Sequence, residues 1–155
     1  MSVAADPYGD DELAALYDLD CGGYDDDLDL YAQFAARGGG GVLELGAGTG
    51  RVALHLARAG HRVTALDAAS AMLARLDSRL DASTRDRVTA ACGDMRTFEA
   101  DARFGLVCCP LFGFEHLLTH DDQRAALARI AAHLAPAGVF VAELRAFGAI
   151  DWAAA

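Results

Sequence analysis

A glycine-rich turn between an apolar run and a helix constrains the fold of this chain more than any other feature. Residues 42–45 form a short apolar run, and the sequence Gly-Ala-Gly-Thr-Gly follows at residues 46–50. Glycine lets a chain turn sharply and lets its backbone approach a ligand closely. The helix expected at residues 51–59 would point its free N–H groups into the same space. The sequence therefore predicts a ligand cradle at the end of a buried strand.

Short apolar runs alternate with longer amphipathic stretches along the whole chain, which is typical of βαβ units. We predict a doubly wound, mainly parallel Rossmann-like α/β sheet with helices on both faces. About five strands are expected, at residues 42–45, 62–66, 87–91, 104–109 and 139–144. Helices are expected at residues 12–19, 28–37, 51–59, 71–80 and 121–134. Ser70 is the expected N-cap of the fourth helix, Thr119 and Asp122 form a capping box for the fifth, and Gly38 to Gly41 form a flexible joint.

The charge distribution argues against nucleic acid as a partner. The formal net charge is −10, and the residues before Arg37 include ten acidic side chains and no basic one. A phosphate backbone needs clustered Lys and Arg, and this chain has no Lys. No apolar run suits a membrane helix and the N-terminus lacks a secretory pattern, so we expect a cytoplasmic protein with no membrane partner. The spacing of the four cysteines predicts no metal site.

The spacing of the glycine turn distinguishes two classes of nucleotide-binding protein. A dinucleotide-binding turn reads G-x-G-x-x-G, and its third glycine would fall on Arg51, which disfavours a nicotinamide-dependent oxidoreductase. The sequence E-L-G-A-G-T-G at residues 44–50 instead resembles the first motif of class I S-adenosylmethionine-dependent methyltransferases. The resemblance covers approximately residues 17–145. It implies that the cofactor S-adenosylmethionine (SAM) is bound by Glu44, Gly46, Ala47, Gly48 and Gly50.

Asp67 ends the second predicted strand, about twenty residues beyond the glycine turn, as in related nucleotide-binding folds. A carboxylate at this place can accept hydrogen bonds from both ribose hydroxyls of an adenosine. A plain helix cap is the alternative. The resemblance places Ala68 in the same site and Met72 near the adenine, although a core methionine explains Met72 equally well.

The sequence Gly93-Asp94-Met95-Arg96 follows the third predicted strand and is similar to the third motif of the same family. The resemblance implies that Asp94 accepts from the adenine amino group and that Met95 packs on the ring; a surface turn is the alternative. Arg96, like Arg51, could reach the cofactor carboxylate or remain at the surface. Three successive strand ends thus offer suitable groups in the family's order, and this order favours SAM more than any single motif does.

The fourth predicted strand leads into residues 109–118, which in the resembling family pass beneath the methyl donor and begin the acceptor pocket. The resemblance therefore assigns Cys109 to the cofactor site. His116 is the candidate general base if the acceptor needs one, and a packed or capping histidine is the alternative. Tyr17 and Tyr24 precede the sheet, where this family often folds a helix over the cofactor, and we assign them as lid residues.

The predicted function is SAM-dependent methyl transfer to an O, N or C atom of a small-molecule acceptor, with S-adenosylhomocysteine (SAH) as product. A non-catalytic or partner-completed SAM-binding domain is the alternative. We expect an acidic helical cap at residues 1–37, the SAM-binding core at 41–145 and a tail at 146–155. Family members usually have two further strands, which we expect this chain to lack. The edge of the fifth strand would then invite a second copy or another chain.

Overall fold

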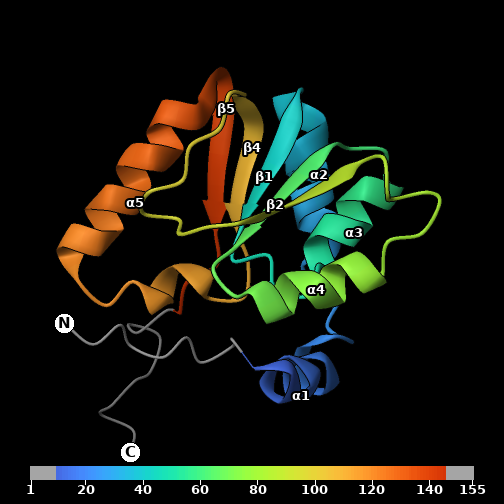
Figure 1. The fold of residues 1–155 in the computed structure, drawn as a ribbon. Coiled ribbons are helices and arrows are strands. Elements are labelled where there is room, and N and C mark those ends of the chain that lie inside the picture. Colours follow the sequence, from blue (N-terminus) through green and yellow to red (C-terminus); the bar gives the residue numbers. More distant parts are fainter. Residues whose placement is uncertain (1–9, 146–155) are drawn as a thin grey trace, which may run out of the picture.

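The computed structural model describes residues 10–145 and consists of one parallel sheet covered by helices (Figure 1). The strands lie in the order β3-β2-β1-β4-β5, and each neighbouring pair is parallel. Their bounds are β1 Gly41–Leu45, β2 Val63–Asp67, β3 Val88–Cys92, β4 Phe104–Cys109 and β5 Leu134–Ala142. The chain order reverses between β1 and β4. Ligands bind such sheets at this reversal, outside the carboxyl ends of the strands.

Helices cover both faces of the sheet and one end of it. The elements are α1 Asp11–Cys21, α2 Leu28–Gly38, α3 Arg51–Arg58, α4 Ser70–Ser78, the short 3₁₀ helix η1 Gly113–His116, and α5 His120–His133. Figure 1 shows α5 on one side of the sheet and α2 and α3 on the other. Helix α1 lies below α4, beyond the carboxyl ends of the strands. The predicted doubly wound parallel fold is therefore confirmed.

Two apolar layers hold the helices against the sheet. Alternate residues of β1 point to opposite faces, so Val42 faces α2 and α3, whereas Leu43 faces α5. The first layer includes Leu56 of α3, and the second includes Ile130 of α5. Both layers are well buried, and they fix the strand ends at which the candidate site is built. Within residues 10–145, no helix is long and apolar enough to cross a membrane.

The helix caps follow the prediction at one helix and depart from it at another. Thr119 caps α5, and its Oγ1 accepts from the Asp122 N–H at 3.1 Å. The prediction of Ser70 as the cap of α4 is wrong, because Ala69 holds the cap position and Ser70 is the first helical residue. Asp67 Oδ1 accepts from the Ala69 N–H at 2.8 Å. The strand-end carboxylate thus replaces the capping function expected of Ser70.

The fifth strand begins earlier than predicted. It starts at Leu134, directly after α5, and ends at Ala142, whereas residues 139–144 were expected. The ladder with β4 is irregular between Phe104 and Leu106, so Phe104 pairs with Leu134 and Leu106 pairs with Val139. Pro136 lies within this irregular stretch, where a residue without an N–H is tolerated. A proline at that place made the first half of the strand unreadable from the sequence.

Residues 38–41 form a tight backbone crossing and not the expected flexible joint. A Cβ atom at Gly38 would lie 2.4 Å from the Gly105 carbonyl oxygen, and one at Gly105 would lie 1.6 Å from the Gly39 carbonyl oxygen. Gly39 and Gly40 also have positive φ angles of 61° and 79°. The glycines are needed because two backbone segments touch here.

Candidate ligand-binding site

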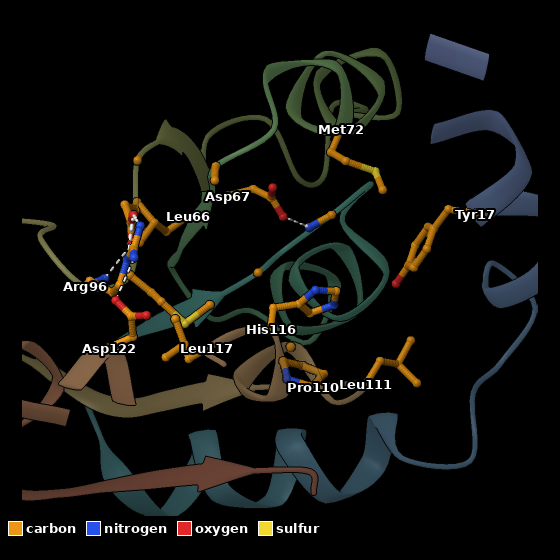
Figure 2. A pocket seen from close by; sticks show the side chains of 17 residues that line it. Tyr17, Leu66, Asp67, Met72, Arg96, Pro110, Leu111, His116, Leu117 and Asp122 are labelled. Atoms are coloured by element: carbon orange, nitrogen blue, oxygen red, sulfur yellow. Dashed lines mark hydrogen bonds and ion pairs between the residues drawn. The ribbon is translucent and has the colours of Figure 1, made fainter. Parts of the chain in front are cut away.

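A cavity of about 320 Å³ lies at the carboxyl ends of the central strands, where the chain order reverses (Figure 2). Residues from α1, the glycine turn, the ends of β2 and β3, α4 and the segment after β4 line it. Nine residues predicted from the sequence lie on its wall: Tyr17, Gly46, Gly48, Asp67, Ala68, Met72, Asp94, Met95 and His116. Segments far apart in the sequence therefore meet at one site.

The glycine turn has a backbone that other residues adopt at a cost. Gly46, Gly48 and Gly50 have φ angles of 67°, 55° and 90°. A Cβ atom at Gly50 would also lie 2.8 Å from the Leu76 side chain. A Cβ at Gly48 would contact the Tyr17 ring at 3.6 Å. The turn therefore brings bare backbone to the cavity wall.

Asp67 connects the glycine turn to the start of α4. Its Oδ2 accepts from the Gly48 N–H at 2.7 Å, and its Oδ1 accepts from the Ala69 N–H at 2.8 Å. Figure 2 shows this carboxylate beside the cavity, with its bond to Gly48 drawn. A carboxylate oxygen can accept more than one hydrogen bond. The group can therefore also accept from a pair of neighbouring hydroxyls on a ligand.

Glu44 lies beneath the turn and not on the cavity wall. Its side chain faces the helix layer with Val42, and the residue is only 2% exposed. Burial raises the pKa of Glu44 to about 8, although the positive charge of Arg51 opposes the shift. Among the described residues, its Oε2 atom has no hydrogen-bond partner. A buried acceptor without a partner calls for a donor, from a proton, a water or a ligand.

The raised pKa of Glu44 predicts a specific dependence of stability on pH. Between pH 4.5 and about pH 8, Glu44 keeps its proton in the folded chain but has released it in the unfolded chain, where its pKa is the ordinary 4.5. Stability should therefore fall as the pH rises from about 4.5 to about 8, with a limiting slope of about 1.4 kcal/mol per pH unit. Glu44→Gln should lack this contribution. Urea unfolding of both chains from pH 5 to pH 8 measures it, and a difference in stability that does not change with pH would contradict the buried-proton account.

Four other predicted cofactor residues, Ala47, Gly50, Cys109 and Tyr24, do not line the cavity. Cys109 points into the layer beneath α5. Tyr24 instead lies under the guanidinium of Arg51, 5.2 Å from the ring centre. Arg51 is bound to Asp27, with Nη2 2.8 Å from Oδ2, so it serves the packing of α2 and α3 rather than the cavity.

Arg96 joins the end of β3 to the start of α5. Its Nε lies 2.9 Å from Asp94 Oδ2, and its Nη1 lies 2.7 Å from Asp122 Oδ1. The hydrogen bonds from Arg96 to Asp94 lower the pKa of Asp94, although its partial burial opposes the shift. Asp94 is therefore an ionised acceptor on the cavity wall. Arg96 is bound by two carboxylates of the protein itself. The sequence had suggested either contact with the cofactor carboxylate or a surface position.

The backbone after β4 is strained where it turns into η1. Leu111 and Phe112 have positive φ angles of 44° and 59°, which are unusual for bulky residues. Glu143 Oε2 accepts from the Leu111 N–H at 3.1 Å, and the Arg145 guanidinium lies 5.3 Å from the centre of the Phe112 ring. These contacts stabilise a conformation that costs on the order of 1–3 kcal/mol per residue. The turn directs η1, and with it His116, toward the cavity (Figure 2).

A second, more open cavity of about 970 Å³ adjoins the first and shares Tyr17, Leu111 and His116 with it. Leucines of α1 and the segment from Leu111 to Leu118 make its wall mainly apolar. Its charged residues are Asp20, Glu115 and Arg145. Arg145 Nε is paired with Glu115 Oε2 at 2.9 Å, whereas Asp20 has no ion pair within residues 10–145.

The cavity wall also includes residues that the sequence analysis did not assign to a site: Leu66, Gly93, Pro110, Leu111, Gly113, Leu117 and Asp122. Most are small or apolar and carry no chemical signature that a motif search could use. Asp122 was assigned only as a helix-capping residue. Its second contact, with Arg96, depends on the packing of α5 against the segment that follows β3, which no local pattern reveals.

Comparison with known proteins identifies the family. Residues 42–138 match the family described as methyltransferase domain. The dTDP-3-amino-3,6-dideoxy-alpha-D-glucopyranose N,N-dimethyltransferase of Streptomyces fradiae is 35% identical over 151 residues, which are 92% of this chain and 57% of that protein. Because the family match covers more than half of the chain, the chain belongs to the methyltransferase domain family, and the predicted resemblance is confirmed.

Solved structures agree with this assignment. SAM-bound CalS10, an amino pentose methyltransferase from Micromonospora echinaspora, is 32% identical with a TM-score of 0.73, covering 88% of this chain and 57% of CalS10. The CcbJ methyltransferase from Streptomyces caelestis is 29% identical with a TM-score of 0.76, covering 87% of this chain and 56% of CcbJ. The chain thus spans little more than half the length of these proteins.

Proposed function

We propose that this chain binds SAM in the 320 Å³ cavity and transfers its methyl group to the nitrogen of a small-molecule amine. The observation that carries the proposal is the Asp67 carboxylate, bound to the Gly48 N–H of the glycine turn where the strand order reverses. This arrangement places a charged acceptor for hydroxyls beside a turn whose backbone can be approached closely. The cavity volume is at the lower end of the range for small-molecule sites.

The residues present suit each part of the cofactor. Asp67 would accept from the ribose hydroxyls, and Asp94 would accept from the adenine amino group, with Met95 and Met72 beside the ring. The glycine turn would lie against the methionine part of the molecule. The SAM-bound state of CalS10 supports the same assignment.

The adjoining 970 Å³ cavity is our proposed acceptor site. Its apolar wall suits a hydrophobic body, and Asp20, which no described cation neutralises, favours a positively charged group. Two of the relatives act on amino sugars by name, which agrees with an amine acceptor.

SAM supplies a methyl group on a positively charged sulfur, which is already activated for displacement. The protein has to orient the cofactor and the acceptor, and to accept a proton from the acceptor. Tyr17 and Leu111 lie where the two cavities meet and would exclude water from the junction. His116 lies there too, and a ring nitrogen would take the proton from the acceptor ammonium. Within the N-terminal cap, we propose that α1 is the part that covers the cofactor.

We also propose that a second copy of this chain, or another chain, covers the outer edge of β5.

Methyl transfer to matched acceptors tests this function. The chain should release SAH when incubated with SAM and small apolar amines, and much less with the corresponding alcohols or carboxylates. His116→Asn should lower kcat by about a hundredfold, the usual size of a general-base contribution, while the affinity for SAH stays nearly unchanged. Methylation of the alcohols in preference to the amines would contradict the proposed acceptor class. An equal loss of SAH affinity would contradict the role of His116.

A further inference from the structure

Four polar side chains outside both cavities join α1 to the glycine turn and to α4. Asp18 of α1 accepts from Thr49 Oγ1 at 2.5 Å through Oδ1, and its Oδ2 accepts from Arg75 Nε at 2.8 Å. Arg79 Nη2 lies 2.7 Å from the same Oδ2. Arg79 Nη1 also donates to Thr49 Oγ1 at 2.9 Å. We call these residues, Asp18, Thr49, Arg75 and Arg79, the Asp18 cluster.

The Asp18 cluster is largely shielded from water at its centre. The Asp18 side chain is 10% exposed and Thr49 is 1% exposed, whereas the two arginines are about one-third exposed. Burial alone would raise the pKa of Asp18, but the hydrogen bonds from Thr49 and Arg75 and the charges of both arginines lower it overall. Asp18 is therefore ionised at neutral pH. Hydrogen bonds to a charged group are stronger than those between neutral groups.

Helix α1 has little apolar contact to hold it in place. Its apolar contact with α4 is a small cluster of Ala14, Tyr17, Ala69 and Met72. Its leucines are exposed, and Leu16, at 59%, lines the second cavity and does not pack on α4. The interactions of Asp18 therefore contribute much of what holds α1 in place beside the cavity.

The position of α1 matters because it carries Tyr17, the residue before Asp18. Tyr17 lies against Gly48 and lines both cavities. Figure 2 shows its ring entering the cavity from the side of α1, opposite the strand ends. Thr49 lies between Gly48 and Gly50 in the turn. One carboxylate thus contacts both the helix that covers the cavity and the turn that forms its floor.

From these contacts we propose that Asp18 is a positioning residue, which holds Tyr17 and the glycine turn together in the arrangement that binds the cofactor. The inference rests on the proposed SAM site but concerns residues that touch no part of that site. Breaking the cluster should let α1 move away and should weaken cofactor binding, even though every group on the cavity wall is retained.

Calorimetric titration with SAH tests this role. Asp18→Asn should weaken SAH binding by about tenfold or more, because charged hydrogen bonds are replaced by weaker neutral ones. Thr49→Val should also weaken it, and Thr49→Ser, which keeps the hydroxyl, should restore affinity to within about twofold of the original chain. Asp77→Asn is the matched control, since Asp77 lies on α4 with a side chain that is 68% exposed. Limited proteolysis should cut α1 faster in Asp18→Asn and Thr49→Val only.

The outcomes separate the two proposals. If the unsubstituted chain binds SAH and Asp18→Asn binds it equally well, the positioning role is overturned and the SAM site stands. If the unsubstituted chain binds no SAH, the proposed function fails. Thermal unfolding of each variant addresses a purely structural role: loss of affinity that follows loss of stability across the series overturns the proposal. If Asp18→Asn does not fold, Thr49→Val against Thr49→Ser decides the question alone.

Discussion

Replacing Asp67 by alanine should reduce SAH affinity by at least about a hundredfold, because it removes two or more charge-assisted hydrogen bonds at once. The substitution deletes the proposed acceptor of the ribose hydroxyls. It also leaves the N–H groups of Gly48 and Ala69 without the partner they have now, so the glycine turn loses one of its links to β2. Calorimetric titration with SAH measures the loss directly.

Two further variants define what Asp67 does. Asp67→Asn keeps one acceptor oxygen and should lie between the original chain and Asp67→Ala. Asp77→Ala, at an exposed position of α4, should leave SAH affinity unchanged. An affinity of Asp67→Ala for SAH within about threefold of the original is a smaller loss than one charged hydrogen bond. It would show that Asp67 only holds the backbone of Gly48 and Ala69 and does not contact the ligand.

Gly105→Ala should have the largest effect on stability, a loss of about 4 kcal/mol or more, because the added carbon overlaps backbone that cannot move aside. Its Cβ would lie 1.6 Å from the Gly39 carbonyl oxygen and 2.7 Å from that of Gly38. Relief of this overlap would separate β4 from the segment that leads into β1. Urea unfolding followed by circular dichroism measures the change.

Two glycines provide the controls for this substitution. Gly23→Ala should change stability by less than about 0.5 kcal/mol, as at an ordinary surface site, since no atom lies within 4 Å of the added carbon. Gly60→Ala also meets no atom, but its φ of 99° isolates the cost of backbone strain. Equal losses for Gly60→Ala and Gly105→Ala would mean that close backbone contact is not the cause.

The sequence predicted the sheet well because its strands are short apolar runs ended by recognisable residues. β4 was predicted at its observed bounds, and β1 to β3 within one residue at each end. Asp67 and Asp94 could be placed at one edge because parallel strands end on the same side of a sheet. The two-residue period of a strand also bears on Glu44. It places this side chain on the same face as Val42, under the helices, whereas the motif alone suggested the cavity wall.

The remaining site features depend on contacts between distant segments. No local pattern predicts the pairing of Arg51 with Asp27 or that of Arg96 with Asp122. The positive φ angles of Leu111 and Phe112 were unreadable because bulky residues rarely adopt them. Gly38 to Gly41 were misread as a flexible joint, since a string of glycines suggests mobility unless its packing partner is known.

The most direct test of the account is parallel titration of the unsubstituted chain with SAH and with NAD by calorimetry. Both ligands contain an adenosine with two ribose hydroxyls, so Asp67 alone does not distinguish them. The glycine turn, with Arg51 where a dinucleotide-binding turn has its third glycine, should do so. We predict saturable binding of SAH and none of NAD. Binding of NAD but not SAH would contradict the assignment of this cavity to SAM.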